Sequence, residues 1–524
     1  FFSFGAGEVT PLFYARPDVE KYKSGAEVIL NFHVLAHGGV TRRPGLRMVA
    51  ECKYTDRTAV VRPFQFSTTQ AFILEMGCSY TRFYKSNAQV TSGGSAVEIT
   101  TPYQSCQLYD VDFVQSADVL YHLHADCNVR KLERYADTCW RFRTVTFQPP
   151  PSFEFGARPI AALDVDATVP AGSDLTATAL YNTAFLNADV GREIVVTAGT
   201  NAGARAGIKA FTSTTVVTAT VCEPWVSLAD VACGSWKITD SPKTTATVAA
   251  ATPVGATTTV TLGVAGWRGT TALDDTDCGR FVLVNGGTFQ ITSLTSTTVA
   301  NARIVGEASG TTAAQSGAWS LEESLWSTTN GFPETGDFFE DRLYLNAGHR
   351  FIGSKTSDYE NFAVGVQDDD AVYFPLNAKT INTIRAIVGA RQLQLLTAGG
   401  EFVATGGSDN PITPTNVRTQ SETTHGTRGV SPLRIGDVTV FTSRAGKQLR
   451  EFTVRADSIS DVYVAPDLLL LAEHLTRDAT IVDLAYQREP RSTIWAVRSD
   501  GVLLACTYRR EENVVAWSRH TTCG

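Results

Sequence analysis

The sequence predicts a mainly β protein organised as a β-propeller of about six hairpin blades. This propeller is interrupted in sequence by an inserted tandem pair of small β-sandwich or barrel domains, and the chain carries few short helices. Three observations predict this fold. Apolar runs rich in Val, Thr, Phe and Tyr alternate with Gly, Asn, Asp and Ser turns. A short hairpin pattern recurs along the chain, and a longer Thr-rich pattern is duplicated in the middle.

Each hairpin unit consists of an apolar strand, a polar turn and a second strand. Such units serve as blades in a propeller, whose radial closure removes the exposed sheet edges that promote aggregation. Hairpins of this type also occur in other antiparallel proteins, so a β fold without a propeller stays open. The six units begin at Gln70, Ala117, Asp341, Arg391, Asp437 and Ser492.

The duplication lies between the second and third hairpins, where charge falls and Thr, Ala, Val and Gly increase. "FTSTTVV" at Phe211 recurs as "LTSTTVA" at Leu294, at an offset of 83 (294 − 211). "GSWKI" around Trp236 recurs as "GAWSL" around Trp319 at the same offset of 83 (319 − 236), and "VGREIVV" at Val190 recurs as "CGRFVLV". We expect each tryptophan to close a small core of Thr- and Val-rich strands.

These patterns divide the chain into four parts. An N-terminal platform or docking segment precedes the first blades, the duplicated insertion follows them, and the remaining blades end the chain. Their expected ranges are 1–60, 61–155, 156–325 (copies at about 160–240 and 245–325) and 326–524.

Two segments favour helix. "RPDVEKYKSGAEVILNF" places apolar residues, among them Val19, Tyr22 and Ile29, roughly on one face. "APDLLLLAEHLTRD" has Pro466 where the first turn of a helix tolerates proline.

Composition excludes several classes of protein. The 524 residues include 45 Lys and Arg against 53 Asp and Glu, a net charge of −8, without the long basic run of an ordinary DNA-binding protein. The 10 cysteines form no CxxC pair, which suits reduced thiols in a cytosolic assembly environment. Short aliphatic runs and an uncharged start predict a soluble chain without a membrane anchor or signal peptide. The missing initiator Met and the abrupt "HTTCG" end suggest a piece of a longer gene product.

Two groups of side chains raise the question of a metal site. His122 and His124 in "YHLH" face the same side of a strand, but no third ligand follows at a recognisable spacing. Asp368, Asp369 and Asp370 lack the alternating ligands and glycine of a calcium loop, so a solvated turn is the expectation. We expect neither group to bind a metal.

Enzyme and nucleotide motifs are absent or incomplete. "GTNAGARAG" from Gly199 is followed by no Gly-Lys-Ser or Gly-Lys-Thr, and "GAGEVT" near the start follows no strand and lacks the third glycine. The sequence contains no GxSxG elbow and no HExxH helix. A propeller glycosidase needs two facing carboxylates, yet "GSKTSDYENF" at Gly353 lacks the glycine and tryptophan of the sialidase-type SxDxGxxW turn. We therefore expect no catalytic residues and no cofactor.

Two long patterns resemble one family. "FGAGEVTPLFYARPDVEKYKSGAEVILNFHVLAHGGVTRRPGLRMVAE", followed by "RPFQFSTTQAFILEMGCSYTRFYK", "TPY" and "VDFVQSADVLYHLHADCNVRKLER", resembles the tail nozzle family of short-tailed bacteriophages (podoviruses), also called tail tubular protein B. "RAGKQLREFTVRADSISDVYVAPDLLLLAEHLTRDATIVDLAYQREPRSTIWAVRSDGVLLACTYRREENVVAWSRHTT" resembles the second half of the same family. The likeness covers residues 1–145 and 335–524, and is weakest in the insertion.

The resemblance implies a non-enzymatic structural virion protein, assembled in the host cytoplasm. It implies a homohexamer that forms the distal ring of the phage tail, where a propeller and accessory β domains surround the channel and gate for DNA ejection. The implied partners are the upper tail ring (the adaptor, tail tubular protein A), tail fibre or spike proteins, and double-stranded DNA in transit, bound without sequence specificity. The ring number rests on the resemblance alone.

"NFHVLAHGGVTRRPG" at the start of this region is interpreted as a strand, a tight turn at Gly38-Gly39, a short strand and a second turn at Pro44-Gly45. We expect its two histidines to pack against neighbouring residues and to make capping hydrogen bonds. We expect Arg42 and Arg43 to form ion pairs with a neighbouring subunit rather than to bind phosphate.

Two other functions stay open. One is a receptor- or glycan-binding tail protein, because tandem Thr-rich β modules also occur in parts that contact the host. The other is a glycan-cleaving propeller, which would require a carboxylate pair at one mouth.

Overall fold

The computed structural model describes residues 3–16, 18–67, 70–156, 159–269, 277–376, 382–407, 410–456 and 461–521. The chain is mainly β, as predicted. It forms two compact units, which are described separately. Unit 1 comprises Phe1–Thr146, Trp326–Glu360 and Val366–Gly524, and unit 2 comprises Phe147–Leu325 and Asn361–Gly365.

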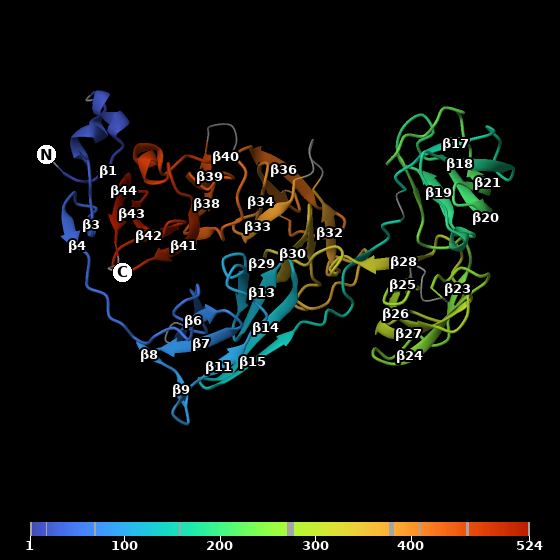
Figure 1. The fold of residues 1–524 in the computed structure, drawn as a ribbon, viewed down its shortest axis with the longest axis horizontal. Helices are drawn as coiled ribbons and strands as arrows, with labels where there is room; N and C mark the ends of the chain where they lie inside the picture. Colours follow the sequence, from blue (N-terminus) through green and yellow to red (C-terminus); the bar gives the residue numbers. More distant parts are fainter. Residues whose placement is uncertain are drawn as a thin grey trace. The chain divides into compact units, whose positions relative to one another are not determined.

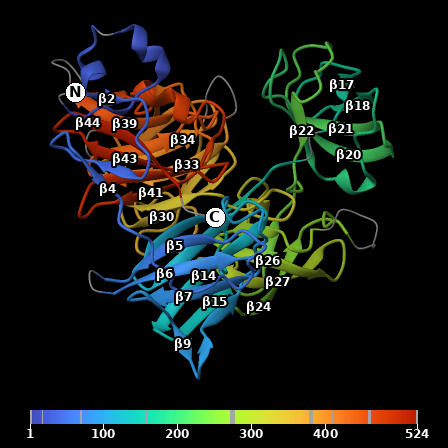
Figure 2. The same cartoon turned by 60° about the vertical axis from the view of Figure 1, so that its left-hand side comes forward.

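Unit 1 contains six sheets of at least four strands in its described part, antiparallel except for two parallel pairings in the sixth, and each has one of the six predicted hairpins at its centre (Figures 1 and 2). The first three sheets are β5 (Val60–Gln65), β6 (Ala71–Gly77), β7 (Tyr80–Lys85), β8 (Ala88–Gln89) and β11 (Glu98–Thr100); β12 (Asp112–Ser116), β13 (Val119–His124), β14 (Cys127–Ala136) and β15 (Cys139–Thr144); and β29 (Gly336–Phe339), β30 (Arg342–Ala347), β31 (Arg350–Gly353) and β32 (Val372–Pro375).

The other three sheets follow in the second half of the chain (Figure 1). They are β33 (Ile384–Gly389), β34 (Leu393–Thr397), β35 (Glu401–Thr405) and β36 (Arg418–Thr423); β37 (Leu433–Ile435), β38 (Val438–Thr442), β39 (Leu449–Ala456) and β40 (Asp461–Val464); and β41 (Ile481–Gln487), β42 (Thr493–Arg498), β43 (Leu503–Arg509) and β44 (Val514–His520). All six predicted hairpins are thus confirmed.

Sheets that follow one another along the chain share apolar cores. The first and second sheets pack through Phe72 and Leu132, because alternating apolar residues of β6 and β14 face a common interior. One core joins the third and fourth sheets, another joins the fourth and fifth, and a third joins the fifth and sixth. Tyr121 of the second sheet contacts Phe338 of the third, with ring centroids 6.2 Å apart.

The two ends of the chain meet in the sixth sheet. β1 (Gly7–Glu8) pairs in parallel with β44, and β2 (Gly25–Ala26) pairs with β1, so the blue and red strands lie side by side in Figure 1. Glu8 is fully buried and accepts hydrogen bonds from the backbone N–H of Ile29 (3.0 Å) and from Arg519 (2.7 Å). Its carboxylate also lies 2.9 Å from His474 Nε2. This buried carboxylate fastens the N-terminal segment to the end of the chain.

Both predicted helices are much shorter than expected. The first segment forms only the 3₁₀ helices η1 (Pro11–Ala15) and η2 (Glu20–Ser24), because Gly25 and Ala26 join the sheet instead. The second forms η4 (Leu470–Leu475), in which Ala472 has non-helical angles. In both cases apolar contacts with neighbouring strands override the local helical pattern. No helix in the described part of the chain is long and apolar enough to cross a membrane.

The segment rich in His, Gly and Arg forms the predicted hairpin of β3 (Phe32–Val34) and β4 (Val40–Arg42). Gly38 has φ 89°, the left-handed conformation that its turn requires. The predicted second turn is wrong, since Pro44 and Gly45 lie in irregular chain. A second small hairpin, β9 (Thr91–Ser92) and β10 (Ser95–Ala96), extends from the first sheet region.

Unit 2 contains the Thr-rich duplication as two sheets with the same strand order. The first runs β17-β18-β21-β20-β19-β22, and the second repeats it as β23-β24-β27-β26-β25-β28, with β16 added beside β28. The bounds are β16 (Ser152–Phe153), β17 (Ala162–Val165), β18 (Asp174–Leu180), η3 (Asn187–Asp189), β19 (Glu193–Val196), β20 (Arg205–Ser213), β21 (Val216–Glu223), β22 (Trp236–Ile238), β23 (Ala246–Val248), β24 (Thr257–Leu262), β25 (Phe281–Val284), β26 (Gly287–Leu294), β27 (Val299–Gly306) and β28 (Trp319–Ser324).

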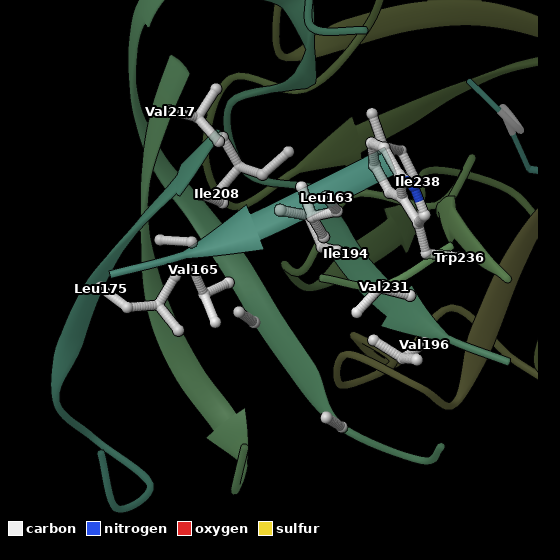
Figure 3. Close-up of a cluster of buried hydrophobic side chains, with 14 of the residues drawn as sticks. Leu163, Val165, Leu175, Ile194, Val196, Ile208, Val217, Val231, Trp236 and Ile238 are labelled. Atoms are coloured by element: carbon white, nitrogen blue, oxygen red, sulfur yellow. The ribbon is translucent and has the colours of Figure 1, made fainter. Parts of the chain in front are cut away.

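Each copy is built around its tryptophan, as predicted. Trp236 is fully buried, and its Nε1–H donates to the carbonyl of Ala161 at 2.9 Å. Trp319 donates in the same way to Thr244 at 2.7 Å. Figure 3 shows how Trp236 lies against apolar side chains of several strands in the first copy. The repeated hydrogen bond means that the duplication preserves side-chain geometry as well as sequence.

Candidate functional site

The first strand of each of the six sheets carries a charged residue whose side chain contacts another sheet or the segment just before it. On the fourth sheet this is Arg385, which pairs with Glu334 at 3.0 Å, and the other five residues form a cluster. We call these residues, Arg62, Asp112, Asp337, Arg434 and Asp483, the first-strand cluster. They lie on β5, β12, β29, β37 and β41. Because they come from segments up to about 420 residues apart (483 − 62 = 421), only the folded chain brings them together. All five residues belong to unit 1.

Asp112 links three sheets. Its Oδ2 accepts a hydrogen bond from the Thr335 hydroxyl at 2.8 Å, next to the third sheet. Its Oδ1 accepts one from the Ser431 hydroxyl at 2.9 Å, just before the fifth sheet. Burial raises the pKa of Asp112, and the two hydroxyl groups partly oppose this effect by stabilising the carboxylate.

Asp337 and Arg434 link the third, fourth and fifth sheets. Asp337 Oδ2 accepts a hydrogen bond from the backbone N–H of Gly389 at 2.8 Å, while Arg434 donates to the Gly389 carbonyl at 2.6 Å. Burial raises the pKa of Asp337 to about 6, and the nearby Asp112 adds to this shift. The hydrogen bonds from Gly389 and Phe338 lower the pKa in part.

Arg62 and Asp483 join the first sheet to the sixth. Their side chains form an ion pair at 2.6 Å, and both are partly shielded from solvent. The Arg62 guanidinium also lies 5.8 Å from the centre of the Phe113 ring in the second sheet. The first and last sheets along the sequence are therefore in contact.

The cluster contains two nearby carboxylates, the feature that a glycosidase would require. All four carboxylate oxygens of Asp112 and Asp337 nevertheless accept hydrogen bonds. Three come from other segments of the chain, and the fourth, to Asp337 Oδ1, comes from the backbone N–H of the adjacent Phe338. A general acid or base must be within reach of substrate, and a nucleophilic carboxylate needs an open approach. This geometry supports a fastening role for the pair.

His122 and His124 lie on the same face of β13, as the strand pattern predicts, despite an irregularity in pairing between them. Both are buried and lie against Tyr103, at ring distances of 6.0 and 6.1 Å. His122 packs among aromatic rings, and neither of its nitrogens has a hydrogen-bond partner in the described part of the chain. No group of three or more His, Cys, Asp or Glu among the described residues is arranged to hold a metal ion.

Asp368, Asp369 and Asp370 form a turn in which Asp368 and Asp369 are exposed, as expected, and Asp370 is half-buried. The buried Arg342 side chain donates to the backbone carbonyls of all three residues, and Lys355 pairs with the carboxylates of Asp369 (3.4 Å) and Asp370 (3.0 Å). The acidic run therefore closes a loop around two basic residues, which are distant in sequence and could not be identified from the local pattern.

The two arginines predicted to contact another subunit differ in environment. Arg42 is exposed at the end of β4. Arg43 is half-buried and donates to the carbonyl of Thr521 at 3.1 Å, so part of its hydrogen-bonding capacity is used within the chain. The glycine-rich segment that begins at Gly199 forms the turn between β19 and β20.

Sequence reasoning missed the first-strand cluster because its members follow no common motif. One signal was present: each charged residue precedes an apolar hairpin by a short distance, on a strand that was not assigned. No protein-family model matches this chain, and no curated protein matches it.

Proposed function

We propose that this chain is a structural subunit of the tail nozzle of a short-tailed bacteriophage. In this proposal its copies form the distal ring of the tail, which serves as the channel and gate for genome ejection. The six sheets of unit 1 are the blades of a propeller, and residues 147–325 interrupt it between the second and third blades. The chain is an assembly component without catalytic residues, metal or cofactor.

The observation that carries the proposal is the sequential contact among the six sheets. Successive sheets share cores or ring contacts, and the ion pair between Arg62 and Asp483 brings the last sheet to the first. A closed ring of sheets has no long unpaired edges. The sequence resemblance to the nozzle family supports the same architecture independently.

In this proposal the first-strand cluster leaves no channel for DNA through the centre of one copy. Asp112 joins the second sheet to the start of the fifth through Ser431 at 2.9 Å, so side chains close the space between these first strands. A duplex whose major groove alone is about 12 Å wide does not fit between them. This supports the part of the proposal in which DNA passes through a channel enclosed by several copies, in a ring closed by heterologous contacts.

Charge supports a conduit that releases its cargo. The net charge of −8 provides no general attraction for phosphates, and tight electrostatic binding would slow the passage of a polyanion. We therefore expect a net acidic or neutral channel lining. The upper tail ring and fibre or spike proteins are the proposed neighbours.

The test is the position and copy number of the chain in virions. Light scattering of the purified chain and image averaging of tails should show a closed ring coaxial with the tail, formed by six copies. Arg42→Ala should weaken ring assembly and leave the fold of the isolated subunit unchanged, with Arg477→Ala as an exposed arginine control. A peripheral position on the virion, or a continuous Lys and Arg lining of the channel, would overturn the proposal.

A receptor- or glycan-binding role for unit 2 is the second candidate. It is favoured by a cavity of about 360 Å³ lined by Asn187, Trp267, Arg268 and Thr297, in which the buried Trp267 Nε1–H has no partner among the described residues. An aromatic ring beside polar donors suits a sugar. Binding of the full chain to a glycan array would support this role over the conduit if the variant Trp267→Phe no longer bound.

A further inference from the structure

A cavity of about 410 Å³ lies beside the β3–β4 hairpin in unit 1, against strands β41, β42 and β43. Its volume falls in the range of small-molecule sites. It has no member in common with the first-strand cluster, so it is independent of the proposed function. Its lining residues are His33, Arg43, Pro44, Gly45, Leu46, Gln487, Pro490, Arg491, Thr493, Trp495 and Leu503.

One side of the cavity is formed by packed rings. His33 is only 7% exposed, and its ring lies 5.4 Å from Trp495, edge to face. His33 also contacts His520 behind it, with ring centroids 5.1 Å apart. The Nδ1 of His33 is buried without a hydrogen-bond partner among the described residues. A buried donor or acceptor without a partner is destabilising, so this ring is suited to a bound ligand.

The charged groups at the cavity are all basic. Arg43 uses one guanidinium N–H to bind the Thr521 carbonyl, which leaves other donors, since the group has five. Arg491 makes no side-chain hydrogen bond in the described part of the chain. The lining contains no carboxylate, although Asp and Glu outnumber Lys and Arg in the whole chain.

The electrostatic effect of this arrangement is visible in the histidines. Burial lowers the pKa of His33, and the positive charges of Arg491 and Arg43 lower it further. The pKa of His520 is lowered to about 4, first by burial and then by His33 and Arg43. A negative charge bound beside Arg43 and Arg491 would offset the positive charges that lower the pKa of His33 and His520.

We infer that this cavity binds an oxyanion of the phosphate-monoester class, carried on a flat or apolar body. Arg43 and Arg491 hold the oxyanion, since guanidinium groups match its geometry and remain charged at all relevant pH values. Trp495 and Leu46 contact the apolar body. The source is either a free phosphate ester or the 5′-phosphate end of a nucleic acid, which present the same chemistry.

Binding is coupled to protonation of His33. A bound anion raises the pKa of this imidazole by direct attraction, so the complex takes up a proton that the free protein releases. The second pKa of a phosphate monoester is about 6, so the ester itself gains a proton in the same pH range. The coupling is therefore measured as protons taken up on binding beyond those that the ester takes up. His520, Arg43 and Arg491 are the other charged or titratable groups facing His33.

Calorimetric titration of the full chain with phenyl phosphate tests this inference. Binding at pH 6 should be weakened at least tenfold by Arg491→Gln and by Arg43→Gln. It should be unaffected by Arg488→Gln, which removes an exposed arginine from the same turn outside the cavity. Inorganic phosphate should bind more weakly than phenyl phosphate because it lacks the apolar body.

Two further measurements complete the test. His33→Phe should weaken binding and reduce the proton uptake on binding at pH 6, and unchanged thermal unfolding would show that the variants fold. A 5′-phosphorylated oligonucleotide that binds with the same Arg491 dependence identifies a nucleic-acid end as the source, while binding of phenyl phosphate alone identifies a free ester. Absence of phenyl phosphate binding at millimolar concentration, or equal loss with Arg488→Gln, would overturn the inference.

Discussion

His122 should make the second sheet of unit 1 sensitive to acid. The side chain is fully buried, and burial lowers its pKa to about 3, with a smaller contribution from Arg130. An unfolded chain has a histidine pKa of about 6.5. Between these values the unfolded chain binds a proton that the folded chain rejects, so stability is lost as pH falls below about 6.5.

The size of the effect follows from the pKa difference. A solution at pH 4.5 is about two pH units below the pKa of histidine in the unfolded chain, and this difference corresponds to about 3 kcal/mol of lost stability. His122→Phe removes the titration and places a ring among Phe113, Phe142 and Tyr103. The variant should therefore gain about 3 kcal/mol relative to the natural chain when pH falls from 7.5 to 4.5.

The comparison between the two pH values is the measurement, because phenylalanine is larger than histidine and also changes packing. Urea unfolding can be followed by hydrogen exchange of peptides from β12 to β15, with labelling pulses at one common pH. His122→Leu should show the same pH-dependent gain, and His37→Gln, a change at an exposed turn, should show none. Equal pH dependence in His122→Phe and the natural chain would refute the reasoning.

Three other predictions concern buried polar groups. Glu8→Gln should destabilise unit 1 by about 3 kcal/mol at pH 7, measured by urea unfolding, because it removes the buried negative charge that pairs with Arg519. Burial raises the pKa of Glu8, but the hydrogen bonds with His474, Ile29 and Arg519 outweigh it and leave the pKa lowered. The difference should therefore disappear at low pH, where the natural carboxylate is protonated too. The natural chain should lose stability as pH rises from 4 to 6, because in this range the unfolded Asp337 carboxyl has lost its proton and the folded one retains it. Asp337→Asn should make this loss smaller, and an unchanged slope of stability against pH would argue against the raised pKa. Trp236→Phe should destabilise unit 2 by about 2–4 kcal/mol in thermal unfolding by leaving the Ala161 carbonyl unpaired, and a loss below about 1 kcal/mol would contradict that role.

The hairpins and the duplication were predictable because they depend on local information. Period-two apolar alternation and turn residues lie within about fifteen residues of one another, so the six hairpins could be read directly. The helices failed for the opposite reason. Around Ala26 the periodic pattern favours a helix, but pairing of β2 with β1, which the local window does not contain, determines the structure.

The candidate sites were less predictable, since they are made by residues from distant segments. Asp112 meets Ser431, and His33 lies against Trp495 and His520, across separations of several hundred residues. Only the presence of basic and imidazole groups near Arg43 was visible locally. Their assignment to a subunit contact stays a prediction for both Arg42 and Arg43, and Arg43 in addition donates to the Thr521 carbonyl within the chain.

The first-strand cluster and the basic cavity belong to two different proposed roles, a conduit for DNA and a site for one phosphate. A conduit for DNA must avoid phosphate along its length, whereas a specific site must hold one phosphate by enclosing it. Arg43 and Arg491 line the cavity beside the β3–β4 hairpin, where no carboxylate faces them, whereas Arg62 and Arg434 of the first-strand cluster are held by Asp483 and by the Gly389 carbonyl. Under the two proposals, removing Arg43 or Arg491 should change ligand binding without changing DNA ejection, and removing Arg42 should do the reverse.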